Sequence, residues 1–221
     1  LRGSVVALNG RRIETMRLPL DAWVALRARH GVWPYGRVLI GAPGPLASVA
    51  EDGASPARGI NFASQDYLSL AAHPAVHEAA RRALHDAGPH SAGSAVLLGN
   101  TRHSQALEAA LGELLGLDQL VLFPTGWAAA FGAITALVHS FDHVVIDALA
   151  HASLRQGAAS ATRNVLVHRH LDCDHVRELL ARIRATDAAN AILVVTEGLF
   201  SMDADSPDLP LLQHLCREYN A

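Results

Sequence analysis

Short apolar runs that alternate with helical stretches restrict most strongly what this chain can fold into. The apolar runs are residues 120–123, 144–146, 165–167 and 191–195. The helical stretches between them are residues 127–138, 151–159 and 173–184. Strands that are apolar along their whole length are buried on both faces, which is typical of parallel sheets. The pattern therefore predicts an α/β fold, with a mostly parallel central sheet and helices on both of its faces.

Further helices are predicted outside this region, and together with the sheet they define the expected domains. Their ranges are residues 20–29, 74–86, 104–115 and 209–219. We expect residues 1–58 to form an N-terminal arm laid against the main body, with a polar linker or hairpin tip at residues 48–59. Residues 59–221 are predicted to be the first part of a large domain, because the pattern stops on a helix with no strand to receive it.

The composition limits the classes of partner that we expect. The 221 residues carry a net charge of −3, so no basic excess indicates nucleic acid. No apolar run approaches the ~20 residues that are needed to span a bilayer. The two cysteines, Cys173 and Cys216, share no metal-ligand spacing, which favours a reduced chain in the cytoplasm.

Two groups of histidines and acids have spacings that bear on metal binding. His139 and His143 are separated by a predicted helix end, which argues against a zinc pair. The second group follows the run 165–167 and consists of His168, His170, Asp172, Asp174 and His175. It has no matching set of partners, and we interpret these residues as polar side chains exposed to solvent in a loop. No metal site is therefore predicted.

The stretch FPTGWAAA, residues 123–130, is a candidate anion site, because ligands of α/β sheets collect at the carboxyl ends of strands. Thr125 would offer its hydroxyl group there, and Gly126 and Trp127 would offer the free N–H groups of a helix start. Phosphate is the natural guest of such a site. A plain strand-to-helix turn with a threonine cap is the alternative, and the stretch alone leaves both open.

Two more strand ends carry side chains with possible chemistry. His151 begins a predicted helix, where it would stack on a flat ring, relay a proton or simply cap the helix. Glu197 follows the last strand, where it would orient a substrate amine or form an ordinary salt bridge, and Ser201 lies one turn beyond. Asp205 and Asp208 are expected to cap the helix that follows.

Taken together, the motifs resemble a known family. They are NFASQDYLSL (61–70), the Gly/Ser loop before GNTRHSQALEAAL (99–111), FPTGWAAA, DALAHASLRQGA and VVTEGLFSMDAD. In this order and spacing they resemble the α-oxoamine synthases, which depend on pyridoxal 5'-phosphate (PLP) and have the transferase fold of type I. The likeness covers residues 35–221 and implies that the large domain is incomplete in this sequence, with its remainder and a small C-terminal domain absent.

The resemblance implies a reaction and its partners. Members of the family condense an amino acid with an acyl thioester, losing CO₂ and giving an α-aminoketone, and the acyl group is carried by coenzyme A or by an acyl-carrier protein. They are dimers with active sites at the subunit interface, so a homodimer is implied as well.

The resemblance also implies which residues hold the cofactor. Thr125, Gly126 and Trp127 match the turn that holds the cofactor phosphate. His151 matches the histidine that stacks on the pyridine ring, and Ser201 matches the serine that hydrogen-bonds near the phenolic oxygen of the ring.

Catalytic and substrate-binding roles are implied for three positions. His151 would help to handle the substrate, and Glu197 would support the amino-acid pocket. Gln65 stands where the family usually has asparagine, facing the substrate. This departure leaves the choice of amino acid open.

Two other departures concern the acyl donor and the missing part of the site. The loop SAGSAVLLGN, residues 91–100, lacks the pattern of the members that use coenzyme A, so an acyl-carrier protein stays open as the donor. All 18 basic residues are arginines, so no Schiff-base lysine is present. We expect the lysine in a continuation of the chain or in a companion chain. The alternatives are a non-catalytic subunit or pseudoenzyme that supports such a synthase, and another aminotransferase or lyase of fold type I.

Overall fold

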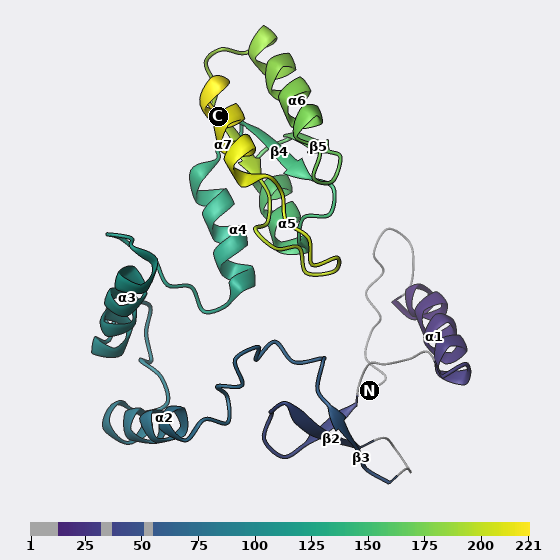
Figure 1. Ribbon diagram of the computed structural model, residues 1–221, viewed down its shortest axis with the longest axis vertical. Coiled ribbons are helices and arrows are strands. Elements are labelled where there is room, and N and C mark those ends of the chain that lie inside the picture. The colour runs from purple at the N-terminus through teal and green to yellow at the C-terminus, as the bar shows by residue number, and fades with distance from the viewer. Residues whose placement is uncertain (1–12, 32–36, 51–54) are drawn as a thin grey trace. The chain divides into compact units, whose positions relative to one another are not determined.

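The computed structural model divides into two compact units, Leu1–Gly99 and Asn100–Ala221. Figure 1 labels their helices and strands. The residues that the structure describes are 13–31, 37–50 and 55–221, with the backbone alone for residues 13–19. The second unit carries most of the predicted site residues, and the first carries Gln65.

The described residues of the first unit form a small antiparallel sheet and two helices. Its elements are α1 (Ile13–Arg29), β1 (Val38–Ile40), β2 (Leu46–Ala50), β3 (Ala57–Ile60) and α2 (Pro74–Ala87). The strand order is β1-β2-β3, and both pairings are antiparallel. β2 and β3 are therefore the arms of a hairpin, as one interpretation of residues 48–59 proposes, and the tip at residues 51–54 lies outside the described residues. α1 begins earlier than the predicted helix 20–29.

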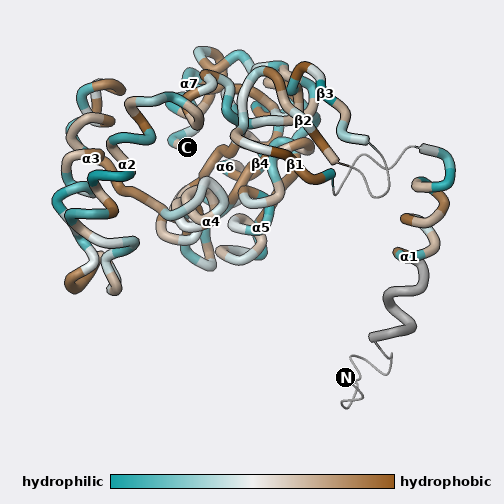
Figure 2. Tube along the Cα trace, turned by 90° about the horizontal axis from the view of Figure 1, so that it is seen from below, coloured by the Kyte–Doolittle hydropathy of each residue, from teal (hydrophilic) through white to brown (hydrophobic). Residues whose placement is uncertain are grey.

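The helices α2 and α3 (Arg102–Leu115) form where predicted because each has a local start signal. In α2, His73 Nδ1 accepts a hydrogen bond from the N–H of Ala75, and Pro74 occupies the first position. In α3, Thr101 Oγ1 accepts from the N–H of Ser104 at 3.1 Å. Figure 2 shows hydrophobic and hydrophilic stretches alternating along both helices, as expected of amphipathic helices.

The second unit is built on a parallel sheet. Its strands are β4 (His143–Asp147), β5 (Asn164–His168) and β6 (Ile192–Val195), in the order β5-β4-β6. Its remaining helices are α4 (Gly126–Leu137), α5 (Ala152–Ala161), α6 (Cys173–Thr186) and α7 (Leu209–Glu218). All four were predicted to within a few residues. In the part of the chain that the structure describes, no helix has both the length and the apolar character that crossing a bilayer requires.

Each face of this sheet has its own apolar core, because successive side chains of a strand point to opposite faces. Val145 packs with residues of α6 and α7, and its neighbours Val144 and Ile146 pack with residues of α4 and α5. The first core consists of Val145, Val176, Leu179, Leu180, Ile183, Ile192, Leu212 and Leu215. The second consists of Ile134, Val138, Val144, Ile146, Ala150, Ala158 and Val195. The predicted α/β sheet with helices on both faces is thus confirmed.

The strand predicted at residues 120–123 is wrong. This segment pairs with no strand among the described residues and runs as a loop into α4. The ring of Phe123 packs against Gly132 of α4 instead. Its carbon Cε1 lies 2.7 Å from the position that a Cβ on Gly132 would occupy. A short apolar run shows that a segment packs, but strand pairing also needs a neighbour.

Candidate functional site

The start of α4 offers unpaired backbone donors. Thr125 caps the helix, and its Oγ1 accepts a hydrogen bond from the N–H of Ala128 at 3.0 Å. The N–H groups of Gly126 and Trp127 have no acceptor among the described residues. The first turn carries no acidic residue, and a Cβ on Gly126 would meet open space. An anion can therefore reach both donors, with the hydroxyl proton of Thr125 and the positive end of the helix dipole beside them.

His151 caps the start of α5. Its Nδ1 accepts from the N–H of Ser153 at 3.2 Å and lies 2.7 Å from Ser153 Oγ, which leaves Nε2 to carry the proton in the neutral ring. The ring of Trp127 meets the ring of His151 edge to face, with 5.8 Å between the ring centres and 76° between the planes. The structure thus brings together the starts of α4 and α5. The cofactor roles predicted for Trp127 and His151 stay predictions.

Glu197 joins this group from the end of β6. Its Oε1 accepts a hydrogen bond of 2.5 Å from the backbone N–H of His151, so the carboxylate holds the residue that begins α5. The partner is a backbone N–H and not the cation of an ordinary salt bridge. The charge of Glu197 also strengthens this hydrogen bond.

Ser201 lies on a loop closed at its base, residues 198–206. Ser206 Oγ donates to the carbonyl oxygen of Gly198 at 2.7 Å, and the N–H of Phe200 donates to the carbonyl oxygen of Asp205 at 2.9 Å. Phe200 is buried and anchors the loop, whereas Ser201 is exposed at the start of a turn. The role predicted for Ser201 stays a prediction.

Gln65 belongs to the first unit, where it is exposed in a turn. Next to it, Ser64 Oγ accepts from the N–H of Asp66 at 2.9 Å, and the carboxylate of Asp66 accepts from Leu70 and Ala71. The turn is thus shaped by its own side chains. The substrate contact predicted for Gln65 stays a prediction.

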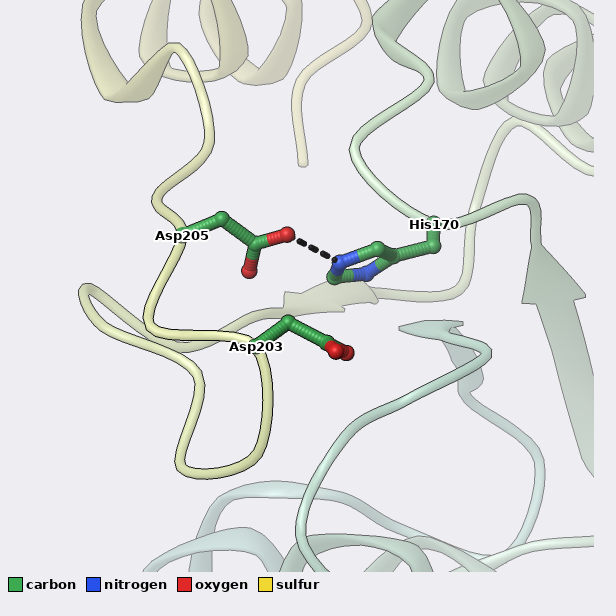
Figure 3. Close-up of side chains that lie close together, drawn as sticks. All are labelled: His170, Asp203 and Asp205. Carbon is green, nitrogen blue, oxygen red and sulfur yellow. Dashed lines mark hydrogen bonds and ion pairs between the residues drawn. The ribbon is translucent and has the colours of Figure 1, made fainter.

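Sequence reasoning missed a triad of side chains, Asp147, His170 and Asp205, beside this group. Asp147 ends β4, and its Oδ1 lies 2.8 Å from His170 Nδ1. His170 Nε2 lies 3.1 Å from Asp205 Oδ2. Figure 3 shows the carboxylates of Asp203 and Asp205 both directed towards the His170 ring. One histidine therefore links the sheet to the 198–206 loop.

These contacts correct two expectations. His168 and His170 are not solvent-exposed loop side chains, because His168 is 2% exposed and His170 is half-buried between carboxylates. Asp205 does not cap α7, whereas Asp208 does, by accepting from the N–H of Leu211 at 3.0 Å. The spacing within the segment 168–175 gave no sign of this, because only the order β5-β4-β6 places the end of β5 beside Asp147.

The charges of the triad follow from its hydrogen bonds. Burial alone would raise the pKa of Asp147, but the N–H of Leu149, the His170 ring and the N–H of Leu171 together hold it below its usual range. The hydrogen bond to Asp147 raises the pKa of His170; partial burial opposes that shift, and Asp205 adds to it. A ring whose two nitrogens both face carboxylates satisfies both only as an imidazolium, since that form donates from both nitrogens.

Three possible metal ligands lie close together around His170. Ligand atoms of His170, Asp203 and Asp205 lie within 4.8 Å of one another (Figure 3). Because an imidazolium has no lone pair to give to a metal ion, the charged ring itself accounts for the position of these carboxylates.

Comparison with curated proteins gives two informative relatives. The chain is 40% identical to the 8-amino-7-oxononanoate synthase of Sodalis glossinidius over 158 residues, which are 72% of this chain and 40% of that protein. It is 36% identical to the 8-amino-7-oxononanoate synthase of Methylobacillus flagellatus over 202 residues, which are 91% of this chain and 49% of that protein. The chain thus spans less than half of the length of each relative. No protein-family model matches it.

Solved structures give the same fold. A serine palmitoyltransferase from S. paucimobilis with a bound PLP–myriocin aldimine superimposes with a TM-score of 0.87 at 26% identity, covering 96% of this chain and 52% of that one. The Sphingomonas wittichii serine palmitoyltransferase gives a TM-score of 0.86 at 28% identity, with coverage of 96% and 51%. These matches extend over both units of the chain.

Proposed function

The chain belongs to the α-oxoamine synthase family, of which it spans the N-terminal portion, and from this premise we propose the reaction of the whole protein. The protein condenses an amino acid with an acyl thioester, with loss of CO₂, to give an α-aminoketone. The observation that carries this proposal is the meeting of a helix start with free N–H donors, an exposed histidine and an anchoring glutamate at one edge of a parallel sheet.

The helix start at Thr125 fits the phosphate of PLP. The N–H groups of Gly126 and Trp127 are free to donate, and no acidic side chain of the first turn repels an anion. Bound there, PLP supplies an electron sink that lets an amino acid lose its carboxylate as CO₂. The protein contributes binding and orientation.

The other predicted site residues take positioning and contact roles in this proposal. His151 contacts the cofactor ring, with the N–H at Nε2 free to donate a hydrogen bond. Glu197 fixes the backbone of His151 and lines the amino-acid pocket. Ser201 donates to the cofactor from the 198–206 loop, and Gln65 contributes to the choice of amino acid.

The proposal extends to partners and setting. The acyl donor is a thioester of coenzyme A or of an acyl-carrier protein, the protein acts as a homodimer, and the Schiff-base lysine lies in a continuation of this chain or in a companion chain. A cytoplasmic setting is part of the proposal. Cys173 and Cys216 are free, and burial raises the pKa of both thiols, so neither is an activated nucleophile.

The test is a reaction with the complete protein. We expect CO₂ release and an α-aminoketone, detected by mass spectrometry, from a panel of amino acids and acyl thioesters only when PLP is present. Release of CO₂ without a ketone would indicate a decarboxylase. Transfer of the amino group to an added 2-oxo acid would indicate an aminotransferase, and either result would contradict the proposal.

A further inference from the structure

The triad of Asp147, His170 and Asp205 adds a second connection between the turn at residues 147–151 and the 198–206 loop. Asp147 Oδ1 accepts from the N–H of Leu149 at 2.8 Å, so it shapes the turn that leads to His151. His151 is held in turn by Glu197, which directly precedes the 198–206 loop. The loop returns to the sheet through Asp205 and His170. The turn at residues 147–151 and the 198–206 loop are therefore connected twice, once through Glu197 and once through His170.

The link through His170 is well defined by its surroundings. The side chain of Asp147 is fully buried, and its second oxygen accepts from the N–H of Leu171 at 3.1 Å, which fixes the carboxylate from two sides. The His170 ring meets the ring of buried Phe200 edge to face, with 4.5 Å between the ring centres. Phe200 belongs to the 198–206 loop, so the loop is held by one apolar contact and one charged contact.

We propose that His170, as an imidazolium between Asp147 and Asp205, is a positioning residue that fixes the 198–206 loop and so presents Ser201 to the cofactor. The effect on the cofactor rests on the proposed function, whereas the effect on the loop does not. No contact of His170 with substrate or cofactor is required, since it acts through Asp205 and the closed base of the loop.

Two substitutions of His170 separate its contact with Asp147 from its contact with Asp205. Asparagine places an amide donor where Nδ1 stands, so His170→Asn keeps the contact with Asp147 and loses the one with Asp205. Glutamine reaches as far as Nε2, so His170→Gln keeps a donor for Asp205. His139→Asn is the control, because His139 also pairs with a buried carboxylate, Asp142, at 3.1 Å but does not contact the loop.

The readout is amide hydrogen exchange of residues 198–206 in the complete protein. The hydrogen bond between His170 and Asp205 joins two charged groups. We expect its loss to lower the protection of the loop against exchange about tenfold. We expect this loss in His170→Asn, a smaller loss in His170→Gln and none in His139→Asn. Equal protection in wild type and His170→Asn would overturn the proposal.

The pH dependence separates a charged link from simple packing. The charged groups around His170 are Asp147 from β4, Asp203 and Asp205 from the loop, and His168 from β5, which lies 3.9 Å from Asp147. Because the carboxylates raise the pKa of His170, the link is complete below the ordinary histidine value and is lost as pH rises through the raised value. We expect wild-type loop protection to fall over that window, and His170→Gln to show no such step.

Two further measurements, chelator treatment and PLP titration, distinguish this proposal from a metal site and from a failure of the proposed function. If chelator treatment of the wild type removed the protection, a metal ion would hold the loop and the imidazolium link would be refuted. Titration with PLP is run on the same variants, and we expect weaker binding by His170→Asn, a smaller loss in His170→Gln and none in His139→Asn. Protection that follows the expected pattern in a protein that binds no PLP would sustain the link and refute the proposed function. Normal PLP binding with unchanged loop protection in His170→Asn would do the reverse.

Discussion

At the scale of single residues, carboxylates at strand ends do much of the positioning in the second unit. Asp142, which precedes β4, accepts from the N–H groups of His139 and Ala191 at 2.8 and 3.0 Å. Asp147 and Glu197 do the same for the turn to His151 and for His151 itself. Backbone donors outside regular ladders are thus satisfied by ionised side chains.

Asp142 gives a prediction on stability. The N–H of His139 is the main cause that lowers its pKa, burial opposes it, and the N–H of Ala191 adds to the lowering. A lowered folded-state pKa contributes stability that is present above the unfolded value and lost as pH falls through the folded one. We expect Asp142→Asn to unfold more easily at neutral pH, by about 1–3 kcal/mol, and to lose less stability than wild type below about pH 4.

Denaturant unfolding across this pH range measures the difference. Asp118→Asn is the matched control, because Asp118 is exposed in a loop and no shift of stability is expected there. An Asp142→Asn curve parallel to that of the wild type at every pH would contradict the assigned role of the carboxylate.

Glu197 gives a prediction on activity. Removal of a charged acceptor from the N–H of His151 is expected to cost about 1.5–3 kcal/mol, so Glu197→Ala should lower kcat/KM by about ten- to a hundredfold. Glu197→Gln keeps an acceptor and should lose less. Steady-state kinetics with Glu178→Ala, an exposed change on α6, as control would refute the contact if both alanine variants behaved alike.

At the scale of elements, the contact between α4 and α5 places Trp127 beside His151. A Cβ on Gly157 of α5 would lie 3.2 Å from Phe131 Cα and 3.3 Å from Ile134 Cβ, both on α4. The helices therefore approach closely because this position has no side chain.

Gly157→Val tests that approach. Overpacking against backbone that cannot move aside is expected to destabilise the protein by about 1–3 kcal/mol. It should also weaken PLP binding, since the two helix starts would separate. Ala159→Val, on the exposed side of α5, is the control. Equal unfolding midpoints for the two variants would show that the helices do not depend on Gly157.

Elements were predictable from sequence where local rules decide them. The caps at Thr125, His151 and Asp208 follow from side chains that reach backbone donors a few residues away. The contact between Glu197 and His151 spans 46 residues and needed the sheet order. The strand order also places His170 between Asp147 and Asp205, which the sequence alone did not indicate. Residues 120–123 form no strand because no described strand pairs with them.

At the scale of the whole molecule, the family could be predicted from sequence because its motifs are spread along the chain, and those at Thr125, His151 and Glu197 meet at one edge of the sheet in the second unit. Residues as distant as Thr125 and Glu197 reach that edge through separate elements, and both relatives and solved structures match over both units. The assignment of roles to Ser201 and Gln65 is still a prediction, because it depends on cofactor and substrate contacts.

The most direct test of the account is the affinity of the complete protein for PLP, measured by titration and followed by cofactor absorbance. Thr125→Ala removes the hydroxyl group and the helix cap, whereas Thr125→Ser keeps both. We predict that Thr125→Ala binds PLP at least about tenfold more weakly than wild type and that Thr125→Ser binds nearly as well. Equal affinity of all three proteins, or no PLP binding by the wild type, would contradict the central claim that this helix start holds the cofactor phosphate.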